Sequence, residues 1–316
     1  MKIFNLIIGI CCLSAFISCE KEITVKLPTP EEQLVVEGYI ENDKPPYVFL
    51  TKSTPYFGSF DINDLPQYFV SGADITVYSD SDSVQLVEYS SEMINLLPEE
   101  ERRQLSIFFG IPLDSNLQLP KISIYTVPMG SSFVGAFHKS YRLKIQSGLK
   151  VLTAVTSIPG PVGFEKLWVE QHPNPQYDTL VMLYGRVKDP DTLGNFYRYF
   201  TRKNEMMFSQ NFQSVLDDLL ANGKEFDIQI PYGIDRFGDH KFDINTFGYW
   251  NKKDTCYVKL SCIDRAHYLF RRSLEDALGN QGSPFGGYTR VQSNIVGGLG
   301  IWGGLASTTS VYYPQP

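Results

Sequence analysis

The most informative segment of the chain is Leu34-Val35-Val36-Glu37-Gly38-Tyr39-Ile40. Its β-branched and aromatic residues favour extended backbone, and polar residues bound it on both sides. Comparable segments recur along the first half of the chain, at 47–52, 73–78, 84–89, 141–145 and 151–156. Short apolar or alternating segments separated by turn residues are typical of antiparallel β-structure. The sequence therefore predicts a mainly β protein.

These six segments are enough for one β-sandwich. Between two of them, Ser79-Asp80-Ser81-Asp82-Ser83 predicts a hairpin loop, because its side chains can hydrogen-bond to the nearby backbone. Pro159-Gly160-Pro161 marks the end of this part of the chain. We therefore expect an N-terminal β-sandwich domain at 33–160 and a second β-rich domain at 161–316.

One insertion, at 92–129, interrupts the predicted sandwich. Pro98 precedes three glutamates, whose charges stabilise the positive end of a helix, and Gly110 can end that helix. Its apolar face consists of Leu105, Phe108 and Phe109. An insertion of this kind can contact a partner or cover a sheet edge, and both interpretations stay open.

The second half of the chain predicts further strands together with two amphipathic helices. The strand candidates lie at 179–187, 196–202, 226–230, 255–263 and 307–313. The first helix is predicted at 212–220, where apolar residues recur with helical spacing, and Gly223 follows its end. The second begins after Asp264, a good N-cap, and ends at Gly279. We expect both apolar faces to pack into the core.

The first nineteen residues predict a targeting segment. The apolar run at 3–18 is shorter than the ~20 residues of a membrane-spanning helix, which favours a secretory signal peptide at 1–18. Phe16-Ile17-Ser18-Cys19 resembles the lipobox of bacterial lipoproteins, in which the cysteine is acylated after cleavage just before it. We expect lipidation of Cys19, followed by an extended tether over 19–32. The alternative is an ordinary signal peptide in which Cys19 has no role.

Several patches of the chain carry a resemblance to one family. They are 35–40, 70–77, 247–250 with Asp254, 258–264 and 293–301. Together they resemble the Bacteroidota lipoprotein family of domain of unknown function 4249, with the last patch as the most specific piece. The resemblance implies an outer-membrane lipoprotein, often encoded beside TonB-dependent receptors that import nutrients, and it implies no catalytic residue. The first domain also resembles transthyretin- or carboxypeptidase-regulatory-type sandwiches, with Gly72-Ala73-Asp74-Ile75 at the usual strand entry, so we expect an immunoglobulin- or transthyretin-like first domain.

A glycine-rich motif near the end of the chain requires a choice between two interpretations. Gly298-Leu299-Gly300-Ile301-Trp302-Gly303 has the spacing of a dinucleotide-binding loop, but only thirteen residues follow it. That is too few for the helix and the acidic residue that such a loop needs. The sequence therefore favours a glycine-rich strand or bend in which Trp302 or another backbone packs closely.

Acidic residues in the second half suggest, but do not complete, a cation site. A partial calcium-loop pattern consists of Asp243, Asn245, Gly248 and Asp254. Phe247 occupies a position in this pattern where an oxygen ligand is required. A looser site would use Asp235, Asp239, His240 and Asp243, and the alternative is a solvated acidic turn. We predict no metal ligand and no cofactor.

The remaining reactive side chains give no catalytic pattern. The four histidines form no zinc-binding pair, and no nucleophile motif is present, so we predict no catalytic residue. His267 stands beside Arg271 on the second predicted helix, where we expect it at the surface or on the flank of the helix. Cys256 and Cys262 lie on one predicted strand, ~20 Å apart, which is too far for a disulfide. We expect two free, buried thiols.

Three tripeptides resemble the O-glycosylation acceptor pattern that Bacteroidota use outside the cytoplasm. Their acceptor residues would be Ser83, Thr179 and Thr192. A formal net charge of −7, with scattered positive charges, argues against a nucleic-acid partner.

The sequence thus points to a non-enzymatic protein on the outer membrane, facing the cell exterior and bound to membrane lipid through acylated Cys19. With the family resemblance, we expect an accessory or binding component of a TonB-dependent nutrient-uptake receptor. Two alternatives stay open: a surface hydrolase acting on carbohydrate or peptide, which needs converging carboxylates in a pocket, and an adhesin or envelope-structural protein. The sequence leaves the ligand and the oligomeric state undetermined.

Overall fold

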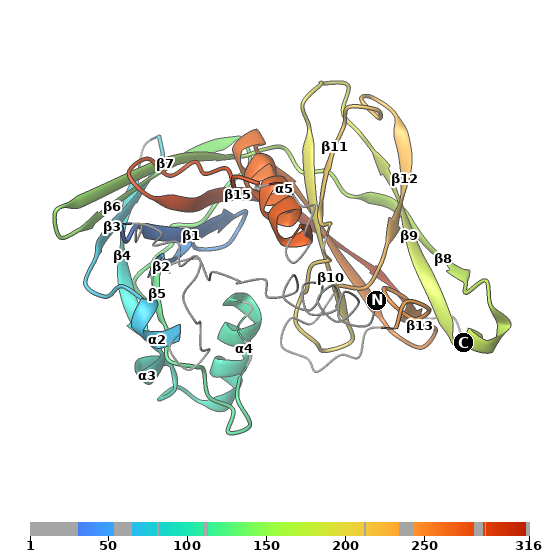
Figure 1. The fold of residues 1–316 in the computed structure, drawn as a ribbon, viewed down its shortest axis with the longest axis horizontal. Helices are drawn as coiled ribbons and strands as arrows, with labels where there is room; N and C mark the ends of the chain where they lie inside the picture. Colours follow the sequence, from blue (N-terminus) through green and yellow to red (C-terminus); the bar gives the residue numbers. More distant parts are fainter. Residues whose placement is uncertain are drawn as a thin grey trace, which may run out of the picture. The chain divides into compact units, whose positions relative to one another are not determined.

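Strands carry most of the structure, as predicted, and most of them join one mixed sheet (Figure 1). The computed structural model describes residues 31–53, 65–80, 82–109, 111, 113–211, 213–233, 243–280, 287 and 289–313. In spatial order the large sheet contains β11 (Val215–Asp217), β10 (Phe196–Lys203), β14 (Cys256–Ile263), β15 (Leu299–Tyr312), β1 (Leu34–Glu41), β2 (Tyr47–Lys52), β5 (Ser123–Thr126), β4 (Ser83–Ser90), β3 (Asp74–Tyr78), β6 (Lys139–Ser147) and β7 (Lys150–Ile158). A smaller sheet contains β12 (Glu225–Ile230), β9 (Leu180–Lys188), β13 (Trp250–Asn251) and, paired with β9, β8 (Phe164–Gln171).

Helices occupy the connections between strands. Those in the described part of the chain are α2 (Leu65–Tyr68), α3 (Ser91–Ile94), α4 (Glu99–Phe109), the 3-10 helix η2 (Pro175–Tyr177) and α5 (Arg265–Gly279). Helix α4 confirms the predicted insertion helix, with three glutamates in its first turn. Helix α5 begins after the predicted cap, because the Asp264 carboxylate accepts a hydrogen bond from the His267 backbone N–H at 2.8 Å. None of these helices is long and apolar enough to cross a membrane.

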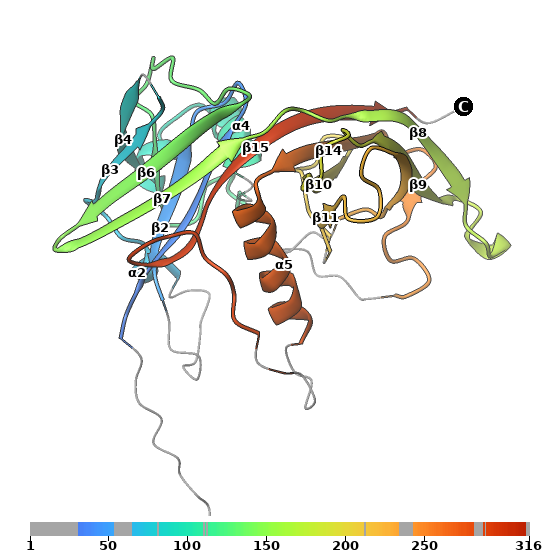
Figure 2. The same cartoon turned by 90° about the horizontal axis from the view of Figure 1, so that it is seen from above.

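Strand β15 joins the two halves of the large sheet. Residues 299–305 pair in parallel with β1, and residues 306–312 pair antiparallel with β14. In Figure 2 it is the long red strand that arches toward β14. Strands from before and after residue 160 therefore share one sheet. The predicted domain boundary at 160/161 stays a prediction.

The glycine-rich motif forms the start of β15, as the sequence favoured. Trp302 is fully buried and donates a hydrogen bond from its ring N–H to the Tyr141 carbonyl at 3.0 Å. It packs directly on Gly38 of β1, where an added Cβ would lie 2.9 Å from the indole ring. Gly300 has a φ of +105°, and a side chain there would collide with the Val36 backbone. The glycines of this motif thus allow strand β15 to pack closely against β1.

The predicted helix at 212–220 is wrong. Residues 215–217 form β11, which pairs with β10, and residues 219–223 form a turn. Leu219 and Leu220 are 73% and 91% exposed, so the apolar stripe does not face a core. The Asp218 carboxylate accepts hydrogen bonds from the backbone N–H groups of Gly194 and Asn195, at 2.8 and 2.9 Å. These contacts favour the turn, and the free edge of β10 supplies a partner strand that helical spacing alone cannot reveal.

The two thiols confirm their prediction. Cys256 and Cys262 lie on β14, both buried and both free. Burial raises the pKa of each thiol to about 12, so neither forms a thiolate at neutral pH. Cys19, the signal peptide and most of the tether lie outside the described residues.

Candidate functional site

One pocket, of about 440 Å³, collects side chains from elements that are far apart in the sequence. Its lining comes from β1, β2, α4, β10, β14, β15, α5 and the loop at 206–210. Figure 1 shows α5, in orange, beside β10 and β15, which it also contacts. A volume of this size suits a small-molecule ligand.

Arg271 of α5 lines the pocket and is 6% exposed. One of its Nη atoms donates a hydrogen bond to the Tyr39 hydroxyl at 2.7 Å, and that hydroxyl donates in turn to Glu37 at 3.2 Å. Glu37 lies 3.7 Å from Arg271, but its side chain is 58% exposed, so solvent screens this ion pair. Arg271 is therefore held mainly through a neutral phenol, because burial raises the pKa of Tyr39.

Arg198 of β10 also lines the pocket and is 3% exposed. Its guanidinium donates a hydrogen bond to the Gln210 side chain and lies 3.2 Å from Nε2 of His267. It also stacks over the Phe200 ring, 4.4 Å from the ring centroid. No carboxylate of the described chain lies within 4.0 Å of it, and the Nε atoms of Arg198 and Arg271 have no hydrogen-bond partner there.

His267 is fully buried behind Arg198, so the prediction of a surface position for it is wrong. The imidazole packs under the backbone of β15: a Cβ at Gly303 would lie 2.6 Å from its Nδ1 atom. Burial and the charges of Arg198 and Arg271 lower the pKa of His267 well below its usual value. His267 is therefore neutral at neutral pH and accepts a hydrogen bond from Arg198 without neutralising its charge.

Burial and the neighbouring Arg271 cation lower the pKa of Arg198 to about 10. The guanidinium stays charged at neutral pH, although it is less stable in this form than an arginine in water. The pocket thus contains two buried cations that repel each other and have unused hydrogen-bond donors.

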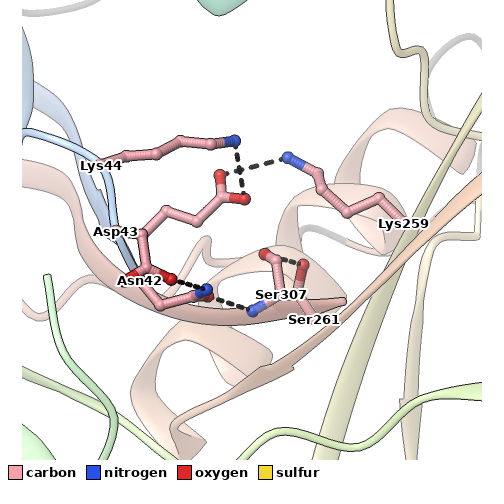
Figure 3. A network of polar contacts seen from close by, with 7 residues as sticks. Asn42, Asp43, Lys44, Lys259, Ser261 and Ser307 are labelled. Atoms are coloured by element: carbon pink, nitrogen blue, oxygen red, sulfur yellow. Dashed lines mark hydrogen bonds and ion pairs between the residues drawn. The ribbon is translucent and has the colours of Figure 1, made fainter. Parts of the chain in front are cut away.

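A second cationic group lies at the β14 side of the pocket. The Glu41 carboxylate accepts a hydrogen bond from Lys44 at 2.9 Å and from Lys259 at 3.2 Å, and the two lysines approach it from opposite sides in Figure 3. Burial alone would raise the pKa of Glu41, but the two lysines outweigh it and the pKa is lowered. Nearby, Ser261 and Ser307 hydrogen-bond across β14 and β15 at 2.7 Å (Figure 3).

The opposite wall of the pocket is apolar. Helix α4 contributes Ile107, Phe108 and Phe109, and its Phe109 ring contacts Tyr47 edge-on with centroids 5.3 Å apart. The loop at 206–210 adds Met206, Met207 and Phe208. Charged and apolar surfaces therefore face the same space.

A protein-family model, Domain of unknown function (DUF4249), matches residues 20–310. The chain belongs to this family. Among curated proteins, none matches the chain. The DUF4249 match includes every residue of the pocket named above.

The site residues predicted for this DUF4249 chain lie elsewhere. Ser83, Thr179 and Thr192 are described and exposed, and none of them lines the pocket, so their glycosylation stays a prediction. Asp243 accepts hydrogen bonds from Asn245 within its own turn, at 2.9 and 3.0 Å. Asp235, Asp239 and His240 lie outside the described residues. Within the described part of the chain, no three acidic, histidine or cysteine side chains are grouped as metal ligands.

Arg198, Arg271 and Lys259 line the pocket but were not predicted as site residues. One signal was present for Arg198, because it interrupts the otherwise aromatic run Phe196-Tyr197-Arg198-Tyr199-Phe200. A charged side chain inside a strand that is otherwise aromatic indicates either an outward position or a buried functional one. Arg271 carried no such signal, since its helix also has polar residues at its surface.

Proposed function

We propose that this DUF4249 chain is a non-enzymatic binding protein that holds a small molecule in the pocket of Arg198 and Arg271. The observation that carries this proposal is that two almost fully buried arginines, Arg198 and Arg271, line one pocket of about 440 Å³, and that Arg198 has no carboxylate within ion-pair distance in the described chain. Buried charged groups without full pairing are costly, and their usual use is to bind a ligand.

The cellular context of this proposal comes from the sequence. A lipid anchor on Cys19 would hold the body on the outer membrane, facing the cell exterior, and the bound molecule would be passed to a TonB-dependent uptake receptor. The pocket supports a binding role, and the lipobox and the family resemblance support the location and the receptor.

A hydrolase is the weaker candidate, because the pocket acids are unsuited to donate a proton. A catalytic acid needs a raised pKa, whereas the pKa of Glu41 is lowered by its two lysines. Glu37 is 58% exposed and belongs to the Tyr39 and Arg271 chain of contacts.

The test is a pull-down of the full-length tagged chain from detergent-solubilised membranes, with mass spectrometry of what is recovered. We expect a TonB-dependent receptor to be enriched with the wild-type chain. Cys19→Ala serves as the matched control: it should leave the membrane fraction and lose the receptor. Recovery of no such receptor with the wild-type chain would contradict the uptake role.

A further inference from the structure

We propose that the pocket binds an organic acid with an apolar body, with its acidic group between Arg198 and Arg271. This inference rests on the proposed binding role and names the ligand class of the same site.

The charge inside the pocket is opposite to that of the chain. The lining contains four cationic side chains, Lys44, Arg198, Lys259 and Arg271, and two carboxylates, Glu37 and Glu41. The whole chain has a formal net charge of −7. A local excess of positive charge in an acidic protein favours an anionic ligand.

The two carboxylates leave Arg198 without compensation. Arg271 differs, because burial lowers its pKa but Tyr39, Glu37 and Glu275 outweigh burial and raise it. Glu41 is already shared by Lys44 and Lys259, and Glu37 is largely in solvent at 3.7 Å from Arg271. Arg198 has no carboxylate within ion-pair distance in the described chain, and the charged neighbour that most affects its pKa is the like-charged Arg271. An anion placed between them would remove the repulsion and accept charge-assisted hydrogen bonds from the two guanidinium groups.

The immediate partners of the arginines are neutral and rigid. Gln210 and His267 hold Arg198, and Tyr39 holds Arg271, so each guanidinium is oriented but keeps its charge. His267 is itself held in place by its close packing against Gly303 of β15. This preorganisation lowers the entropic cost of binding an anion at this point.

The apolar side chains of the pocket determine what the non-acidic part of the ligand can be. Phe108, Phe200, Phe208 and Met207 line it, and their side chains form an apolar surface without hydrogen-bonding groups. A free inorganic anion would leave this wall unused. An acid with an aromatic or aliphatic body would bury it and satisfy both surfaces.

The test uses two fluorescent probes that share one ring system. 1-Anilinonaphthalene-8-sulfonate is anionic, and N-phenyl-1-naphthylamine lacks the acidic group. We expect the wild-type chain to bind the anionic probe with one-to-one stoichiometry and at least about tenfold more tightly than the neutral probe. Displacement by 1-naphthoate, but neither by 1-naphthalenemethanol nor by inorganic phosphate, would show that acid and apolar body are both required.

Variants locate the binding in this pocket. Arg198→Gln should weaken the anionic probe about tenfold or more while changing the neutral probe little, whereas Phe208→Ala should weaken both. Arg186→Gln is the matched control, because Arg186 lies on β9 outside the pocket lining. Folding of each variant is checked by circular dichroism and thermal unfolding. If Arg198→Gln does not fold, the wild-type probe pair and the displacement series decide on their own.

Equal affinity of the wild-type chain for the two probes, or displacement by phosphate as effective as by naphthoate, would overturn the ligand class. So would an unchanged ratio of the two affinities in folded Arg198→Gln. The uptake role fails separately, in the pull-down, since a receptor can be recovered whether or not the probes discriminate.

Discussion

His267 and Gly303 are the pair of residues on which the geometry of the pocket depends. The imidazole lies directly under the β15 backbone and holds Arg198 from behind. The glycine at position 303 leaves the room that this contact requires. The absence of a side chain at position 303 of the glycine-rich motif therefore leaves room for the imidazole that positions Arg198 on strand β10.

Gly303→Ala is expected to destabilise the protein by about 1–3 kcal/mol, because the new Cβ would lie 2.6 Å from Nδ1 of His267 and one of the two must move. Urea unfolding measures the free energy. Gly279→Ala is the control, since nothing lies within 4 Å of a Cβ there and α5 continues to that residue. An equal loss in both variants would contradict the close approach.

Protonation of His267 should cost stability below its normal pKa. The pKa is lowered in the folded protein, so the unfolded chain binds more protons and stability rises with pH. We expect the free energy of unfolding to be constant above pH ~6.5 and to fall below it, and His267→Gln to flatten that slope. Urea titrations between pH ~5 and ~8 measure it, with His138→Gln as the comparison variant. A slope that survives in His267→Gln would assign the pH dependence to other groups.

For single residues, the sequence predicted the burial of the two cysteines but not that of His267. Cys256 and Cys262 could be placed because the spacing along a strand fixes both their face and their separation. His267 could not, because helical spacing shows which residues share a face but not that β15 covers the face holding His267 and Arg271. The buried arginines are hidden from sequence by the same limitation.

At the scale of elements, helix α4 is a wall of the pocket more than a cover for a sheet edge. Phe108 and Phe109 both contact Tyr47 of β2, with ring centroids 5.5 and 5.3 Å from it, and Ile107 lines the pocket beside them. The predicted helix is confirmed, while its role follows only from what it packs against.

Phe109→Ala should loosen α4 locally. We expect protease cleavage within 99–109 to become faster and the free energy of unfolding to fall by about 1–3 kcal/mol, since a partly buried ring is lost. Arg103→Ala is the control: its ion pair with Glu99 is about half exposed and contributes little. Unchanged cleavage in Phe109→Ala would show that α4 is held by other contacts.

The mispredicted elements are those whose structure depends on partner strands from other parts of the chain. The 212–220 segment has helical spacing but becomes strand and turn, because pairing with β10 and the hydrogen bonds of Asp218 outweigh it. Strands β5 and β8 were not predicted, and β15 begins at Leu299, earlier than its expected start at 307. Partner strands from distant parts of the chain supply what these segments lack locally.

At the scale of the whole molecule, the two halves of the large sheet are joined by β15, the last strand in sequence order. Residues 35–41 of β1 pair with residues 299–305, and Trp302 fills the space over Gly38. The sequence predicted the β class and most strands, but the pairing of the first strand with the last has no local signal.

The isolated segment 33–160 should therefore fail to fold. It lacks β15, which leaves the edge of β1 unpaired and removes a fully buried tryptophan from the core. Circular dichroism and urea unfolding of 33–160 and of 33–316 would compare them, with 33–160 mixed with 161–316 as the rescue. Cooperative unfolding of 33–160 alone would instead support an independent domain ending at residue 160.

The parallel pairing of β1 with β15 also determines when, during synthesis of the chain, β1 can complete its hydrogen bonding. Val35 and Leu299 are register partners although 299 − 35 = 264 residues separate them. A ribosome, or a translocation channel, releases β1 long before β15, so β1, an interior strand of the sheet, keeps one edge unpaired until residues 299–305 emerge. A chain that stops short of residues 299–305 is therefore left with an exposed edge on β1 that quality-control proteases can recognise.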